Sequence, residues 1–138
     1  MNISVMDGSS YFKGLLLLIR KDGKVTEMER ELMTRIGKNL GFESGFVENA
    51  IHEILDNRFI TVTPPEFSTR ELAEKFLRDG LTLAFSDREL HPGEEKWLLS
   101  VAKCNNIDLK WLGEEKEKIM TGPSGNEQLE ADSLKVIY

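Results

Sequence analysis

The feature that most constrains this chain is an internal duplication. Residues 14–55 align without a gap with residues 79–120, at an offset of 65 positions. Few residues are identical, but the apolar positions keep the same phase along the 42 aligned residues, and two carboxylates recur inside a turn. Self-similarity at a fixed offset is the sequence signature of a fold built from copies of one supersecondary unit. The alignment therefore predicts a domain with two related halves.

The first copy carries the signals of three helices separated by short turns. Its predicted N-cap residues, whose side chains accept backbone N–H groups at the start of a helix, are Ser9 or Ser10, Thr26 and Ser44. Glu29 lies three residues after Thr26, and this spacing is the signature of a capping box. The glycine of the Asp-Gly-Lys turn ends the first helix, because glycine adopts the left-handed conformation at little cost.

The second copy repeats this order of signals. Its predicted helix starts are Ser68 with Glu71, His91 with Glu94, and Asp108. The linker between the copies, residues 56–67, contains paired prolines, which block a helix. No segment alternates between apolar and polar residues for long enough to predict a strand.

These signals predict an all-α compact bundle of six to seven helices within residues 1–120, built from two related three-helix repeats. Residues 121–138 begin with a Gly-Pro-Ser-Gly sequence, which is typical of a mobile connection. We therefore expect a flexible C-terminal tail. Docking of its apolar end on the domain or on a partner is the less favoured alternative.

The composition narrows the possible functions. Lys and Arg total 18 against 24 Asp and Glu, a formal net charge of −6, so no basic surplus neutralises phosphates and nucleic-acid binding is not expected. The single cysteine, Cys104, excludes an intramolecular disulfide and a cysteine-rich metal site. The longest apolar run, residues 15–19, is far shorter than the ~20 residues that cross a bilayer. We expect a cytoplasmic protein.

Four carboxylates recur at equivalent positions of the two turns: Asp22 and Glu29 in the first copy, and Asp87 and Glu94 in the second. If the two turns meet in space, these side chains form an oxygen-only ligand set, which suits Ca²⁺, Mg²⁺ or Mn²⁺. A purely structural interpretation is favoured over the metal site. Glu29 and Glu94 stand where a capping box needs a glutamate, and aspartate is an ordinary turn residue.

The two turns also carry a resemblance. Residues 22–29, Asp-Gly-Lys-Val-Thr-Glu-Met-Glu, and residues 87–94, Asp-Arg-Glu-Leu-His-Pro-Gly-Glu, resemble the repeated motif of the TerB-like family of helical proteins associated with tellurite resistance. The second copy departs from the family pattern, because Arg88 replaces the turn glycine and His91 replaces the usual Ser or Thr cap. The resemblance covers about residues 10–120.

Membership in this family implies an all-α bundle with pseudo-two-fold related halves and an acidic cluster that holds a divalent metal. It also implies roles in stress response and in complexes near the membrane. The first functional hypothesis is therefore a non-enzymatic, metal-binding module of the tellurite or stress response. The alternative is a protein-interaction scaffold whose acids are only helix caps, with its partners, still unidentified, bound in a groove between the halves or through the tail.

A metal-dependent hydrolase is the weakest of the three hypotheses. The sequence contains no glycine-rich phosphate loop, no Gly-x-Ser-x-Gly elbow and no His-Glu-x-x-His motif. We therefore expect a protein that is not an enzyme, and whose only cofactor is the divalent metal of the first hypothesis.

Overall fold

The protein is an all-α bundle. Its computed structural model describes residues 1–22, 24–56, 62–122 and 129–138, with the backbone alone for Asp22. Six α-helices form the described part of the chain: α1 (Val5–Ile19), α2 (Glu27–Asn39), α3 (Ser44–Asp56), α4 (Arg70–Ala84), α5 (Pro92–Cys104) and α6 (Leu109–Thr121). Two short 3-10 helices, η1 (Arg20–Asp22) and η2 (Glu130–Ser133), and two short strands, β1 (Asn2–Ser4) and β2 (Lys135–Ile137), complete it. This architecture confirms the predicted fold class.

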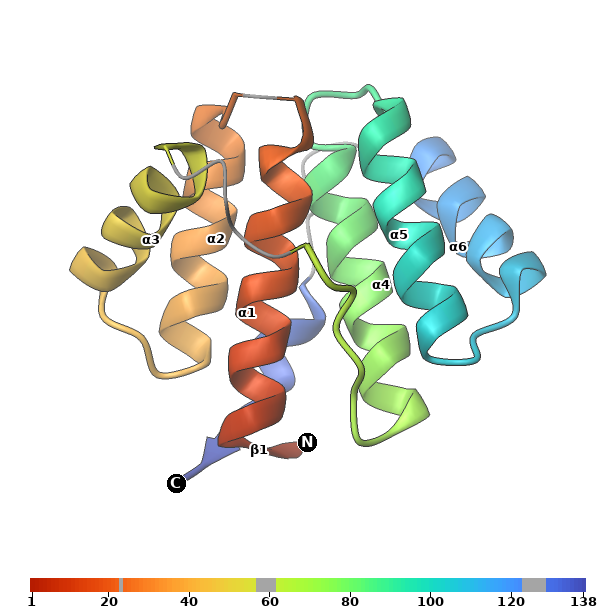
Figure 1. The fold of residues 1–138 in the computed structure, drawn as a ribbon. Coiled ribbons are helices and arrows are strands. Elements are labelled where there is room, and N and C mark those ends of the chain that lie inside the picture. The colour runs from red at the N-terminus through yellow and green to blue at the C-terminus, as the bar shows by residue number, and fades with distance from the viewer. Residues whose placement is uncertain (23, 57–61, 123–128) are drawn as a thin grey trace.

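The helix boundaries follow the duplication. Helices α4, α5 and α6 begin and end 65 residues after α1, α2 and α3 respectively, the same offset that aligns the two copies in the sequence. Helices α1 and α4 lie side by side at the centre, α2 and α5 flank them, and α3 and α6 lie outermost (Figure 1). The α1–α2 and α4–α5 turns lie at one end of the bundle, and both chain termini lie at the other end (Figure 1).

Several helix starts follow the capping signals in the sequence. Thr26 caps α2, and its hydroxyl oxygen lies 3.1 Å from the backbone nitrogen of Glu29, which donates to it. The side chain of Asp108 caps α6 by accepting the backbone N–H of Lys110 at 3.0 Å. His91 occupies the N-cap position of α5, as its spacing from Glu94 predicts.

The caps predicted for α1 and α4 are wrong, and Ser44 is the first residue of α3 rather than its cap. Helix α1 starts at Val5, and its cap is Ser4, which accepts the N–H of Asp7 at 3.1 Å; Ser9 and Ser10 lie inside the helix. The cap of α4 is Thr69 rather than Ser68. In both cases long-range pairing decides the boundary.

The pairing partners of these two segments lie far away in the sequence. Ser4 belongs to β1, which is held extended by β2, so the chain enters α1 earlier than the local sequence indicates. The hydroxyl of Ser68 donates to the carboxylate of Asp7, and its backbone N–H donates to the same carboxylate at 3.2 Å. Ser68 therefore ties the linker to the start of α1 instead of capping α4.

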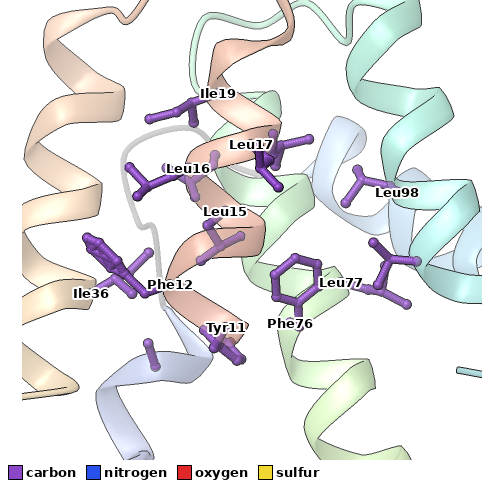
Figure 2. Close-up of a cluster of buried hydrophobic side chains, with 14 of the residues drawn as sticks. Tyr11, Phe12, Leu15, Leu16, Leu17, Ile19, Ile36, Phe76, Leu77 and Leu98 are labelled. Carbon is purple, nitrogen blue, oxygen red and sulfur yellow. The ribbon is translucent and has the colours of Figure 1, made fainter. Parts of the chain in front are cut away.

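The core gathers around α1. Its residues from Leu15 to Ile19 are all at most 7% exposed, because α1 packs against α2, α3, α4 and α5. Figure 2 shows Tyr11 and Phe12 of α1 with Phe76 and Leu77 of α4 in the same apolar layer. Among the described helices, none is both long and apolar enough to span a membrane.

Residues 129–138 do not form the predicted flexible tail; residues 123–128 lie outside the described part of the chain. Strand β2 pairs in parallel with β1, with Val136 opposite Ile3, which also corrects the expectation that the chain has no strand. The side chains of Leu129, Ala131 and Leu134 are buried. Partners from α1, α2 and α4 hold this segment, and no local sequence pattern reveals such distant partners.

Candidate functional site

The two acidic turns lie at the same end of the bundle, as the metal hypothesis requires (Figure 1). The first turn packs against the start of α5: a Cβ atom added to Gly93 would lie 3.4 Å from the Cβ of Lys21. The Lys21 ammonium lies 4.7 Å from the centroid of the Trp97 ring, and burial lowers the pKa of Lys21. The packing of the halves therefore brings the cation of Lys21 against α5.

The two glutamates of the predicted ligand set are buried helix caps. Glu29 is 4% exposed and Glu94 is 1% exposed. An Oε1 atom in each accepts the N–H of its own N-cap residue, from Thr26 at 2.9 Å and from His91 at 3.1 Å. Each carboxylate also lies at the positive end of its helix dipole, which stabilises its charge.

The aspartates of the ligand set are less fully described. One oxygen of Asp87 accepts the N–H of Glu89 at 3.0 Å, and the other lies 3.2 Å from Nε2 of His91. The side chain of Asp22 lies outside the described part of the structure. Within the described residues, no three His, Cys, Asp or Glu side chains form a group that suits a metal ion. The four-carboxylate site stays a prediction.

A second site, missed in the sequence, holds the segment 129–134, named here the C-terminal strap. Asp79 of α4 is fully buried and uses both carboxylate oxygens. Oδ1 accepts the N–H of Glu130 at 2.6 Å, and Oδ2 accepts the N–H of Ala131 at 2.9 Å and the hydroxyl of Tyr11 at 2.6 Å. Burial raises the pKa of Asp79 to about 6, against the lowering effect of these three hydrogen bonds.

Burial and the neighbouring Asp79 carboxylate raise the pKa of Tyr11 well above its usual value. The hydroxyl of Tyr11 therefore keeps its proton at neutral pH and remains a donor to Asp79.

The strap also carries two acids that pair with the bundle. The Glu130 carboxylate lies 3.0 Å from Nζ of Lys75 and 3.8 Å from Nη1 of Arg78, both on α4. The Asp132 carboxylate accepts hydrogen bonds from Arg35 and, at 2.7 Å, from Nδ2 of Asn39, both on α2. These bonds from Arg35 are the main reason that the pKa of Asp132 is lowered. The strap thus connects the two halves of the bundle.

The residues that receive the strap form one surface, the strap-binding face. Its members are Arg35, Asn39, Lys75, Arg78 and Asp79, and Tyr11 donates a hydrogen bond to Asp79. One sequence signal points to it: Asp79 falls on the apolar face of α4, three residues after Phe76 and four before Leu83, at the position where the first copy has Gly14. That signal indicates a buried acid with a partner, but it does not identify the strap as the partner.

An apolar cavity of about 200 Å³ lies among α4, α5 and α6. Its rim includes an ion pair between Glu95 and Lys116 at 3.0 Å. Gly113 borders the cavity, where the equivalent residue of the first copy, Glu48, forms a 2.7 Å ion pair with Arg30. The two halves thus share a backbone arrangement but differ in how they fill the space between their last two helices.

No family model, curated protein or solved structure matches this chain in the comparisons made. The resemblance to the TerB-like family therefore depends on the two turn motifs and on the duplication.

Proposed function

We propose that the protein is a non-enzymatic helical scaffold that binds other proteins, and that the acids of its two turns are structural: Glu29 and Glu94 cap helices, and Asp87 accepts a backbone N–H within its turn. The observation that best supports this structural role is the matched pair of hydrogen bonds from the N-cap N–H groups to the two glutamates. Glu29 and Glu94 are both buried, and one carboxylate oxygen of each accepts the N–H of its own N-cap residue. Capping alone therefore accounts for the recurrence of these two glutamates in both copies.

From the resemblance of residues 22–29 and 87–94 to the TerB-like motif, we further propose that this scaffold acts in a tellurite or stress response. That part of the proposal depends on the motif alone. The duplicated helices agree with it, because the family is a bundle with two related halves.

A divalent-metal module is the second candidate, and one observation favours it. Both turns lie at the same end of the bundle, and Asp87 pairs there with His91 at 3.2 Å, which places an oxygen and a nitrogen ligand side by side. Asp22 would have to complete the site, together with an oxygen of Glu29 or Glu94. Ca²⁺, Mg²⁺ and Mn²⁺ are the ions that such oxygen-rich sites prefer.

Calorimetric titration of these three ions into chelator-treated protein separates the two candidates. The scaffold predicts no saturable heat in the wild type or in the Asp22→Ala/Asp87→Ala variant. The control is Glu114→Ala/Glu117→Ala, which removes the same charge from exposed positions of α6. Saturable heat in the wild type and the control, lost in the Asp22→Ala/Asp87→Ala variant, would replace the scaffold by the metal module.

A further inference from the structure

The strap is bound to the bundle as a peptide ligand is bound to a receptor. Its backbone, its charged side chains and its apolar residues each meet a separate partner on the strap-binding face. We propose that this face is a peptide-binding site, that the strap occupies it in cis, and that a partner protein binds by inserting an acidic segment of the same pattern in its place. This inference rests on the proposed scaffold function and names the class of its partner.

Recognition of the backbone comes from Asp79. A fully buried carboxylate is costly unless hydrogen-bond donors surround it, and two of its three donors are the N–H groups of Glu130 and Ala131. The fold itself does not require an acid here, since the first copy has Gly14 at the equivalent position of α1. Asp79 thus serves to hold a second chain segment through its main chain, and main-chain recognition tolerates different sequences.

Recognition of side chains comes from cations on both halves. Lys75 and Arg78 pair with Glu130, and Arg35 pairs with Asp132. Between these acids lies Ala131, which has no exposed surface. The site therefore selects a small residue with an acid on each side.

The ends of the strap add an apolar requirement. Leu129 and Leu134 are each 5% exposed and pack against the core. The pattern that the face recognises is Leu-acid-small-acid-x-Leu, which the chain itself supplies as Leu-Glu-Ala-Asp-Ser-Leu.

The contacts that hold the strap are weak enough for a partner segment to replace it. The Arg35–Asp132 pair is 44% and 40% exposed, and the Glu130 side chain is 31% exposed, so each ion pair is weakened by water and salt. Strands β1 and β2 have three residues each, and an isolated two-stranded sheet is marginal in water. A partner segment therefore competes mainly against the high local concentration of the tethered strap.

The test uses the full chain with the strap charges reversed, Glu130→Lys/Asp132→Lys, and a fluorescein-labelled peptide with the sequence of residues 129–138. Fluorescence anisotropy is expected to show saturable binding to this variant, at least about ten-fold tighter than to the wild type, whose own strap competes. The control chain, Glu114→Lys/Glu117→Lys, carries the same charge change on α6 and is expected to behave like the wild type. A peptide with both acids replaced by lysine is expected not to bind.

Swapping the charges of Arg35 and Asp132 tests whether the peptide binds at the strap-binding face. The Arg35→Glu variant of the otherwise native chain, whose own Asp132 is then repelled, should bind a peptide carrying Asp132→Lys more tightly than the native peptide. If circular dichroism shows that the double strap variant is unfolded, Asp132→Lys alone takes its place. A folded strap variant that does not bind the native peptide would overturn the inference.

Three further results separate the inference from related possibilities. If the wild type is a dimer that the peptide converts to monomer, the face binds a second copy of this chain. That result would overturn the proposal that a different protein binds there. If calorimetry shows saturable metal binding and the peptide also binds, the acids of the turns are not purely structural, but the peptide site remains in place. Absence of both metal heat and peptide binding would overturn the peptide site alone.

Discussion

The hydroxyl of Tyr11 donates to the carboxylate of Asp79 at 2.6 Å, 68 residues away in the sequence, at a position that has no contact with solvent. This pair joins the central helices of the two halves, α1 and α4. The same carboxylate receives two backbone N–H groups of the strap. One side chain therefore couples the packing of the halves to the docking of the chain's last residues.

Replacing Asp79 by Asn should destabilise the protein by about 2 to 3 kcal/mol. In the variant, an amide nitrogen, itself a donor, would take the place of a carboxylate oxygen that accepts N–H or O–H groups in the wild type. Tyr11→Phe is the matched control: it removes a single donor and should cost about 1 kcal/mol. Urea denaturation measures both changes. Hydrogen exchange at the amide of Ala131 should accelerate strongly in Asp79→Asn and much less in Tyr11→Phe. Equal effects of both variants at this amide would contradict the central role of Asp79.

The pH dependence of stability follows from the raised pKa of Asp79. Burial raises this pKa to about 6 in the folded state, above the value of about 3.9 expected for an unfolded chain. The folded protein therefore takes up this proton at a higher pH than the unfolded chain. The contribution of Asp79 to stability is fully present below the unfolded pKa and is lost as the pH rises through about 6.

Lowering the pH from 7 to 5 should thus stabilise the wild type relative to Asp79→Asn, by about 1 kcal/mol. Urea denaturation of both proteins at each pH gives the difference. Asp132 has the opposite sign, because Arg35 lowers its pKa, so its contribution is lost only as the pH falls through that depressed value. A gap between the two proteins that is unchanged from pH 7 to pH 5 would show that Asp79 does not titrate in this range.

The sequence predicts the framework of this fold better than its sites. The phase of apolar residues and the caps Thr26 and Asp108 depend on neighbours within a few positions, and the structure confirms them. The strap-binding face could not be predicted, because Asp79 meets Glu130 and Ala131 only after the bundle has assembled. Contacts across 51 and 52 residues leave no periodic trace in the sequence.

The acidic turns show the same division between local and distant information. The spacing of Thr26 and Glu29 predicts a capping box, and the structure has one. Whether four carboxylates converge depends on how two turns 65 residues apart pack together, which no local pattern specifies. The structure brings the turns to one end, where Lys21 of the first turn packs against Gly93 and Trp97 of α5.

Loss of the cap at α2 should cost stability without affecting the strap. Thr26→Ala removes the acceptor for the N–H of Glu29 and is expected to destabilise the protein by about 1 kcal/mol. Ser100→Ala is a suitable control, because its exposed hydroxyl bonds only to the carbonyl of Lys96 in its own helix. Thermal unfolding measures both variants. A change in exchange at the strap amides in Thr26→Ala would contradict the separation of these two sites.

The close approach of the central helices gives the sharpest test of the packing. A Cβ atom at Gly14 would lie 2.8 Å from the ring of Phe76, which is fully buried, and 3.0 Å from Cγ of Pro65. Gly14→Ala should therefore destabilise the protein by about 1 to 3 kcal/mol through overpacking, although alanine favours a helix.

Gly113 provides the matched control on α6. A Cβ atom there meets nothing within 4 Å, so Gly113→Ala should stabilise the protein by about 0.5 to 1 kcal/mol through helix propensity alone. The two variants make the same chemical change in helix interiors and differ only in what the added methyl group contacts. Urea denaturation should therefore give free energies of unfolding that change in opposite directions. Stabilisation by both substitutions would mean that α1 and α4 do not pack as closely at Gly14 as the structure shows.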